Sequence, residues 1–295
     1  MKTWLKRVLV FCIVSFLTLW GMVVVFGVYF TVRPRITTIE DLDVLAGRPV
    51  ESVTIETSDH VALSAWYVSE HAERAVILLA GIDSNRRACV ERAAFYLEAG
   101  YSVLLPDLRA SGQSGGRAVT LGWRERKDLI ACYVYLRDRG YRHIGANGIS
   151  LGAATICFAL PELPDLAFVV LESSYDTLAN AVRNRLAVVG APHFIAYPYY
   201  LGLSLFTGTP AWRLRPLDYM AYCTMPALIM AGDAEIELSV SETQALYDAC
   251  ASAHKTLYFF RGGRHEDFLR NYPEQYTEVL ETFLNEIASY ARKAA

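Results

Sequence analysis

The sequence lacks the features that mark several classes of protein. In 295 residues it has only six cysteines and a net charge of −3, and it contains no internal repeat and no low-complexity tract. No basic cluster follows the N-terminal region, which argues against nucleic acid as a partner. The cysteines outside that region show no paired spacing, so we expect single buried thiols, with neither a disulfide framework nor a zinc site. No metal or other cofactor is expected.

Charge is also absent from a long run near the N-terminus. No charged residue lies between Val8 and Phe30, whereas basic residues flank the run on both sides: Lys2, Lys6, Arg7, Arg33 and Arg35. As a helix the run would measure roughly 35 Å, enough to cross a bilayer core of about 30 Å. It is longer than the apolar part of a typical signal peptide, and no A-x-A-like cleavage site follows it. The sequence therefore predicts an uncleaved membrane anchor over residues 1–35, followed by one domain over residues 36–295.

The orientation of this anchor depends on two signals that disagree. Slightly more positive charge precedes the run than follows it, which favours an N-terminus inside and a domain outside. The unpaired cysteines instead suit a reducing compartment. We expect a single-pass membrane protein. The charge signal favours an extracytoplasmic domain, and the disagreement with the cysteine signal leaves the orientation open.

Apolar runs and helical patterns alternate along the domain. A hairpin is predicted over Val50–Thr57 and Val61–Val68. The later predicted strands are mostly apolar: Ala75–Ala80, Tyr101–Leu105, His143–Asn147, Leu166–Leu171, Ala227–Ala231 and Lys255–Phe260. The predicted helices are Arg86–Ala99, Trp123–Arg139, Ala153–Leu160, Val240–Ala253 and Tyr272–Arg292. Strands that alternate with helices predict the α/β class, with a mainly parallel, doubly wound sheet.

One segment, residues 173–226, does not follow this alternation. It contains no evident strand–helix unit and is rich in aromatic residues and proline: Phe194, Tyr197, Pro198, Tyr199, Tyr200, Phe206 and Trp212. Long insertions of this kind are usually functional or disordered, and this one is too apolar for disorder. We interpret it as a lid with an apolar wall. The alternative is a helical excursion that packs on the sheet and covers no site.

The stretch most typical of a functional site is Arg142–Leu160, which reads RHIGANGISLGAATICFAL. It has the form strand, Gly-x-Ser-x-Gly turn and buried helix, which is the context of a nucleophilic serine. Glycines on either side of Ser150 allow the strand and the helix to approach closely, because glycine has no Cβ. The backbone N–H of Leu151, at the start of the helix, would point at an oxyanion formed on the serine. An ordinary glycine-flanked turn is the alternative.

A serine hydroxyl needs an adjacent base that a third group orients. His265 is the best candidate base, because it follows the last predicted strand in a loop at the carboxyl edge of the sheet. It is not part of a zinc-binding HExxH motif, since no second histidine follows at the required spacing. Asp233 and Glu235 both follow the strand Ala227–Ala231 and are the candidate acids. Position along the sheet does not decide between them.

A serine, an acid and a histidine in this order on such a sheet resemble the α/β-hydrolase superfamily. The resemblance extends over roughly Val50 to Ala288. Residues 106–116, PDLRASGQSGG, are similar to the D-x-R-G-x-G-x-S loop of that family. The chain is most similar to the membrane-anchored serine hydrolases of the peptidase- and esterase-like branch, which implies the α/β-hydrolase fold.

The resemblance also assigns roles to individual residues. The family's acid falls three residues after a glycine, which implies Glu235 rather than Asp233. The family usually has His-Gly after the strand that matches Ala75–Ala80, whereas this chain has Ala80 and Gly81. Because the family's oxyanion donor is the next backbone N–H, the resemblance still implies an oxyanion hole made by Ile82 and Leu151.

Together these features imply hydrolysis of an ester through an acyl-enzyme intermediate, with a small or lipid-like acyl compound as substrate. An amide or peptide bond is the first alternative. A catalytically inactive binding module at the membrane is the second.

Overall fold

The computed structural model describes residues 2–294, and its central element is a twisted sheet of eight strands. The strand order is β12-β11-β10-β9-β6-β7-β5-β4. The bounds are β4 Glu51–Glu56, β5 Ala62–Val68, β6 Arg74–Leu79, β7 Ser102–Pro106, β9 His143–Ile149, β10 Phe168–Glu172, β11 Ala227–Gly232 and β12 Lys255–Phe260. All neighbours pair in parallel except β4 with β5 and β5 with β7. The predicted α/β-hydrolase fold, with its mainly parallel sheet, is confirmed.

Side chains of the central strands fill two cores, one on each face of the sheet. On β6, Ala75, Ile77 and Leu79 belong to one buried cluster, whereas Val76 and Leu78 belong to the other. This is the alternation that a strand requires, because successive side chains point to opposite faces. A strand buried on both faces must be apolar throughout, which explains the uninterrupted runs in the sequence.

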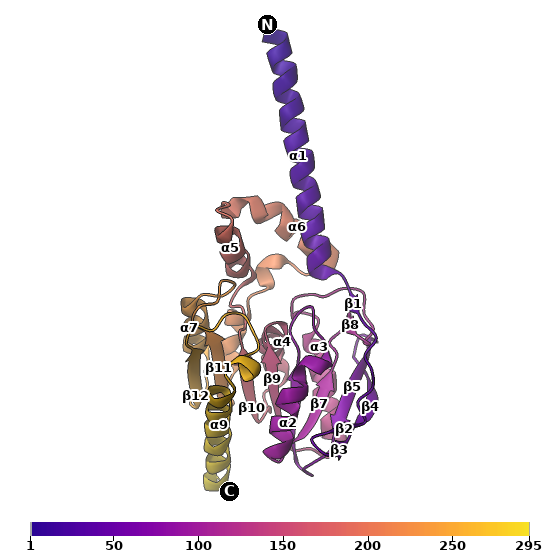
Figure 1. Ribbon diagram of the computed structural model, residues 1–295, viewed down its shortest axis with the longest axis vertical. Helices are drawn as coiled ribbons and strands as arrows, with labels where there is room; N and C mark the ends of the chain where they lie inside the picture. The colour runs from indigo at the N-terminus through magenta and orange to yellow at the C-terminus, as the bar shows by residue number, and fades with distance from the viewer. Residues whose placement is uncertain (1, 295) are drawn as a thin grey trace.

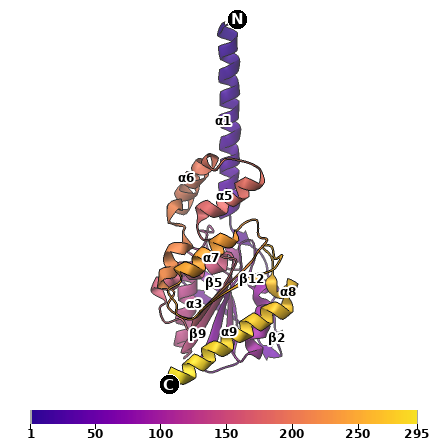
Figure 2. The ribbon, with the colours of Figure 1, turned by 90° about the vertical axis from the view of Figure 1, so that its left-hand side faces the viewer.

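Helices cover both faces, as Figure 1 and Figure 2 show. Their bounds are α2 Val90–Glu98, α3 Arg126–Asp138, α4 Leu151–Ala159, α7 Val240–Ala249, α8 Phe268–Asn271 and α9 Pro273–Ala294. Helices α3, α4 and α7 contribute to the first core, and α2 and α9 contribute to the second. The helix predicted over Arg86–Ala99 begins instead as a 3₁₀ turn, η1 Arg86–Cys89, before α2. The remaining short elements are β1 Arg35–Ile36, β2 Val44–Leu45, β3 Arg48–Pro49, β8 Ser111–Gly112 and η2 Leu160–Glu162.

Residues 173–226, the cap segment, form a set of short helices at one end of the sheet. They are α5 Leu178–Val188, η3 His193–Ala196, α6 Tyr197–Thr207, η4 Ala211–Arg213 and η5 Pro216–Tyr222. In Figure 1, α5 and α6 lie above the sheet, and α6 lies beside the lower part of α1. The absence of a strand from this segment agrees with the sequence. Its function as a lid stays a prediction.

Helix α1, Lys2–Val32, extends away from the body and carries the uncharged run. Within residues 2–294 it is the one helix long and apolar enough to cross a bilayer, with a mean hydropathy of 2.7. Its last turns are nevertheless part of the folded domain. Val28 and Val32 are buried in a third cluster, together with Leu203 of α6 and Phe158 of α4. The predicted division at residue 35 therefore falls just after a helix end that packs against the domain.

Candidate active site

The turn at Ser150 joins β9 directly to α4. Ser150 has φ 51° and ψ −105°, a backbone conformation that is strained for any residue with a side chain. Its backbone N–H donates to the carbonyl of Glu172 at 2.7 Å, which fixes the turn against β10. A Cβ on Gly148 would overlap the backbone of Gly152, and a Cβ on Gly152 would overlap the carbonyl of Leu79. The two glycines are therefore required by the close approach of strand and helix.

We expect Gly152→Ala to lower the free energy of unfolding by at least about 2 kcal/mol, as overpacking of a tight core does. Alanine is intrinsically favoured over glycine in a helix by about 1 kcal/mol, so a loss would report the overlap and not helix propensity. Unfolding by denaturant in detergent measures this change in the free energy of unfolding. Gly115→Ala is the matched control, because its Cβ would come no closer than 3.4 Å to any atom outside the neighbouring residues. Equal stability of the two variants would contradict this account.

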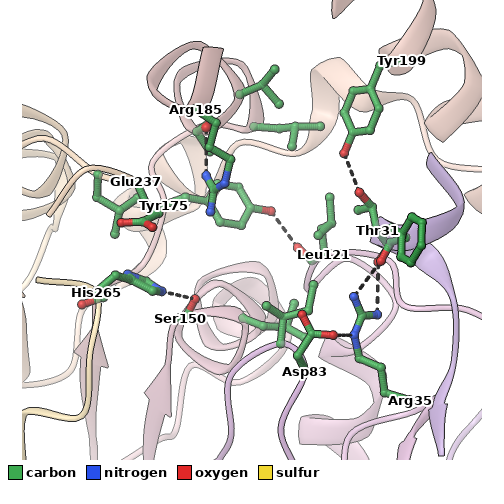
Figure 3. Close-up of a pocket in the computed structure, with 18 residues that line it drawn as sticks. Thr31, Arg35, Asp83, Leu121, Ser150, Tyr175, Arg185, Tyr199, Glu237 and His265 are labelled. Atoms are coloured by element: carbon green, nitrogen blue, oxygen red, sulfur yellow. Dashed lines mark hydrogen bonds and ion pairs between the residues drawn. The ribbon is translucent and has the colours of Figure 1, made fainter. Parts of the chain in front are cut away.

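Three side chains meet at the carboxyl edge of the sheet. The Ser150 hydroxyl lies 3.0 Å from Nε2 of His265, and Nδ1 of His265 lies 2.6 Å from a carboxylate oxygen of Glu235. The Glu235 side chain is fully buried, and that of His265 is 28% exposed. Figure 3 shows the imidazole pointing at the serine. When the imidazole proton is on Nδ1, Nδ1 donates a hydrogen bond to Glu235. The other ring nitrogen, Nε2, is then free to accept the serine proton.

The second oxygen of Glu235 is also fully engaged. It accepts the backbone N–H of Gly232 at 2.8 Å and the hydroxyl of Ser173 at 2.6 Å. Asp233 instead accepts the backbone N–H of Gly262 at 2.6 Å, which ties together the loops after β11 and β12. The structure thus brings Ser150, His265 and Glu235 together and leaves Asp233 outside the hydrogen-bonded chain.

Ser173 is a site residue that no sequence motif identifies. It directly follows β10 and has φ 51°, so it lies at the same edge of the sheet as Ser150. Its position after an apolar strand could have drawn attention to it. Its bond to Glu235 depends on the packing of β10 beside β11, which no local pattern reveals.

The two residues predicted for an oxyanion hole both border the serine. Ile82 and Leu151 line the same cavity as Ser150. Leu151 is the first residue of α4, so its backbone N–H has no acceptor within the helix. The loop that carries Ile82 approaches the turn closely, since a Cβ on Gly81 would lie 3.6 Å from the Ser150 Cβ. The role of the two amides stays a prediction.

A cavity of about 330 Å³ opens next to Ser150. Its walls are mainly apolar and come from the cap segment and from loops at the sheet edge: Leu121, Tyr175, Leu178, Val182, Tyr199 and Leu238. Phe30 and Thr31, at the end of α1, close one side, and the Arg35–Asp83 ion pair lies beside them (Figure 3). The sequence pattern predicts only an anchor for these residues of α1, and it gives no sign of their place in the cavity.

A buried ionic network supports the loop that carries His265. Arg92, on α2, bonds Glu172 at 2.7 Å and also Asp267, two residues after the histidine. Glu172 further accepts from the Asn147 amide and the Tyr276 hydroxyl, each at 2.8 Å. Burial raises the pKa of Asp267, but hydrogen bonding and attraction to Arg92 outweigh it and hold that pKa below its ordinary value. The network joins the histidine loop to the strand beside Ser150.

The residues of the D-x-R-G-x-G-x-S-like loop act in a second network away from the serine. Asp107 bonds the guanidinium of Arg86 at 2.8 Å, and Arg109 bonds Asp128 at 2.7 Å. These contacts hold the loop against α3 and η1.

The part of the chain that the structure describes contains no cluster of histidine, cysteine, aspartate and glutamate that could hold a metal ion. All six cysteines are unpaired, and those outside α1 are buried.

Comparison with known proteins gives relatives of similar length. No protein-family model matches the chain. It is 25% identical to YqkD, an uncharacterized protein of Bacillus subtilis, over 76% of this chain and 75% of the relative. It is 23% identical to YNL320W, an uncharacterized membrane protein of Saccharomyces cerevisiae, over 81% of each chain.

The solved structures similar to this chain include an esterase. The Pyrococcus furiosus esterase Pf2001 superposes with a TM-score of 0.74 and 25% identity, covering 87% of this chain and 98% of the esterase. The match spans nearly the whole esterase and is therefore not confined to one part of the fold. The eight-stranded sheet, the serine turn between strand and helix and this likeness together show that the chain has the α/β-hydrolase fold.

Proposed function

We propose that this chain is a serine hydrolase that cleaves carboxylic esters through an acyl-enzyme intermediate on Ser150. The observation that carries the proposal is the hydrogen-bonded series Ser150, His265, Glu235 beside a mainly apolar cavity. Such a series activates a hydroxyl that is otherwise a weak nucleophile. The likeness to an esterase supports ester hydrolysis in general.

The proposed reaction has two halves. Ser150 Oγ forms a bond to the ester carbonyl carbon while Nε2 of His265 takes the hydroxyl proton. The backbone N–H groups of Ile82 and Leu151 stabilise the negative oxygen of the tetrahedral intermediate. The imidazolium then gives its proton to the alcohol oxygen as the ester C–O bond breaks. Water, deprotonated by His265, attacks the acyl group in the same way and releases a carboxylic acid and free serine.

A fluorophosphonate probe tests this proposal directly. Such probes react with serines that a neighbouring base activates, so we expect one covalent adduct on the native full-length chain, mapped to Ser150 by mass spectrometry. Heat-denatured chain and the Ser150→Ala variant should carry none. Failure of the folded chain to react would favour the alternative of an inactive binding module, and an adduct on another serine would overturn the assignment.

We also propose that α1 anchors the protein in a membrane. The chain is expected to sediment with membranes, to stay there through an alkaline carbonate wash and to be released by detergent. The reason is the uncharged run Val8–Phe30, which is long enough to span the bilayer core. A mature chain whose N-terminus lies after Phe26, identified by mass analysis, would show a cleaved signal instead.

Removing the anchor by a cut near Arg35 has a cost that the sequence alone does not reveal. Val28 and Val32 are buried against the cap segment, and Phe30 and Thr31 wall the cavity. Such a truncated chain would expose apolar surface and open the site. Detergent-solubilised full-length protein is therefore the proper material for activity measurements.

A further inference from the structure

Helix α6 packs against the part of α1 that lies inside the uncharged run. A Cβ on Gly27 would lie 3.6 Å from the Tyr199 ring, and a Cβ on Gly202 would lie 3.0 Å from Val28. The Tyr199 hydroxyl is 3.0 Å from that of Thr31. Small residues that let two helices approach closely are typical of helix contacts within membranes. The contact thus fixes the level of α6 relative to the bilayer.

The depth of this contact follows from helix geometry. The apolar run ends at Phe30, which places the boundary of the bilayer core near that residue. At about 1.5 Å per residue along the helix, Gly27 and Val28 then lie about 3–5 Å inside the core. Helix α6 lies beside the lower part of α1 in both ribbon views. A helix at this level must meet either lipid or another apolar surface.

The opposite side of α6 is apolar, and no other part of residues 2–294 covers it. Tyr197, Leu201 and Leu205, spaced four residues apart, form one exposed stripe, with Leu205 76% exposed. We call the exposed large apolar residues between positions 188 and 212 the cap face: Val188, Val189, Phe194, Tyr197, Leu201, Leu205, Phe206 and Trp212. Residues 188–212 thus expose eight large apolar side chains, and apolar side chains gathered in this way are typical of surfaces that meet another apolar phase.

The charge pattern of the cap agrees with this placement. No aspartate, glutamate, lysine or arginine occurs in residues 186–212, whereas arginines stand on both sides of that range, at positions 183, 185 and 213. Apolar segments bounded by basic residues are typical of helices that lie in the membrane interface, where basic side chains reach the phosphate groups.

The cavity of the proposed site shares its wall with this membrane-level structure. Tyr199 contacts α1 and also lines the cavity. Phe30 and Thr31, at the end of α1, line the same cavity. In Figure 3, Tyr199 and Thr31 meet on the side of the cavity away from His265. The mainly apolar space next to Ser150 is therefore bordered by the helix pair that stands at the bilayer surface.

We propose that the cap face is embedded in the lipid leaflet that holds the end of α1, and that Ser150 receives its substrate from that leaflet. The substrate class is an ester of a long acyl chain that resides in the bilayer. This inference rests on the proposed serine hydrolase and on a membrane-spanning α1. A lipid leaflet is the occupant that fits, because the cap face continues laterally from a helix that is itself surrounded by lipid.

The first test measures the environment of the cap face without using activity. Leu205→Cys, in a Cys12→Ser background, is labelled with an environment-sensitive nitrobenzoxadiazole dye on the full-length chain in phosphatidylcholine vesicles. Val134→Cys is the control, since Val134 lies on α3 and is 48% exposed. We expect a blue-shifted emission that acyl-chain-brominated lipids quench at position 205 and not at 134. A water-like, unquenched dye at position 205 would overturn the proposal.

A second copy of the chain could also cover the cap face, and the same experiment separates this outcome. Dilution of the protein into excess lipid should leave the emission at position 205 unchanged if lipid covers it. Emission that shifts toward that of a water-exposed dye on dilution would indicate contact between copies and would contradict lipid embedding.

The second test asks whether substrate arrives from the leaflet. Leu205→Glu and Phe206→Glu place charge on the cap face, outside the residues that line the cavity. We expect at least about a tenfold loss of hydrolysis of a long-chain acyl ester held in vesicles, since charge is disfavoured in the apolar layer. Hydrolysis of soluble p-nitrophenyl acetate should stay within about twofold of that of the native chain. Val134→Glu should change neither rate.

The outcomes distinguish failure of the inference from failure of the proposed function. If the native chain hydrolyses neither ester and takes no fluorophosphonate label, the serine hydrolase itself is wrong. If it hydrolyses p-nitrophenyl acetate and the charged variants cleave the vesicle-held ester as fast as the native chain, the hydrolase stands and delivery from the leaflet is wrong.

Discussion

Replacing Ser150 with alanine is expected to abolish hydrolysis of p-nitrophenyl acyl esters, with a loss of at least about 10³-fold in kcat/KM. Oγ is the atom that lies 3.0 Å from the imidazole, and no other group at this position could form the acyl bond. The fold should survive the change. The Ser150 backbone, which bonds Glu172, keeps its N–H in alanine, and the lost side-chain hydrogen bond is partly exposed to solvent.

Two measurements make this result interpretable. Thermal unfolding in detergent should give nearly the same melting temperature for Ser150→Ala as for the native chain. The kcat/KM of the variant should approach the second-order rate constant with which free imidazole hydrolyses the same ester without enzyme. A stable Ser150→Ala protein that keeps its esterase activity would mean that the nucleophile is elsewhere.

The sequence predicted the sheet well because the physical requirement is local. A strand covered by helices on both faces must be apolar throughout, as β6 and β10 are. The turn at Ser150 was equally visible, since only glycine fits at both 148 and 152. Each of these features is determined by a few consecutive residues. The catalytic roles drawn from them stay predictions.

What the sequence did not reveal depends on contacts between distant segments. Ser173 reaches Glu235 only because β10 pairs with β11. Arg92 reaches Asp267 across 175 positions of the chain. Phe30 and Thr31 enter the cavity because α6 packs on α1. No spacing or composition rule connects such pairs, and the apolar character of α1 has a sufficient explanation in membrane insertion alone.

The choice between the two candidate acids shows the same limit on a smaller scale. Asp233 and Glu235 are two residues apart in a loop, and both carboxylates are placed to accept backbone N–H groups. Which one faces the imidazole is decided by the path of that loop beyond Gly232. A Cβ on Gly232 would overlap the backbone of Gly263, so the loops after β11 and β12 touch there. That contact lies beyond what the local sequence specifies.

We expect Glu235→Gln to lower kcat by about 10⁴-fold, through the tautomer of His265. One carboxylate oxygen accepts from both Gly232 and Ser173, and a glutamine carbonyl can do the same. The amide NH₂ would then face Nδ1 of the imidazole, where the native carboxylate accepts at 2.6 Å. Two donors cannot share that contact, so Nδ1 must lose its proton and Nε2 must carry one. A protonated Nε2 cannot accept the proton of Ser150.

The comparison variant is Asp233→Asn, which should cost less than about tenfold. An asparagine carbonyl can still accept the Gly262 N–H, and Asp233 makes no hydrogen bond to the imidazole among the described residues. Steady-state kinetics on a soluble ester, with melting temperatures in detergent, separate the two variants from a general loss of fold. Fluorophosphonate labelling should slow in Glu235→Gln and proceed normally in Asp233→Asn. If Asp233→Asn is instead the inactive protein and Glu235→Gln keeps its activity, Asp233 is the acid and the contact between Glu235 and His265 is structural.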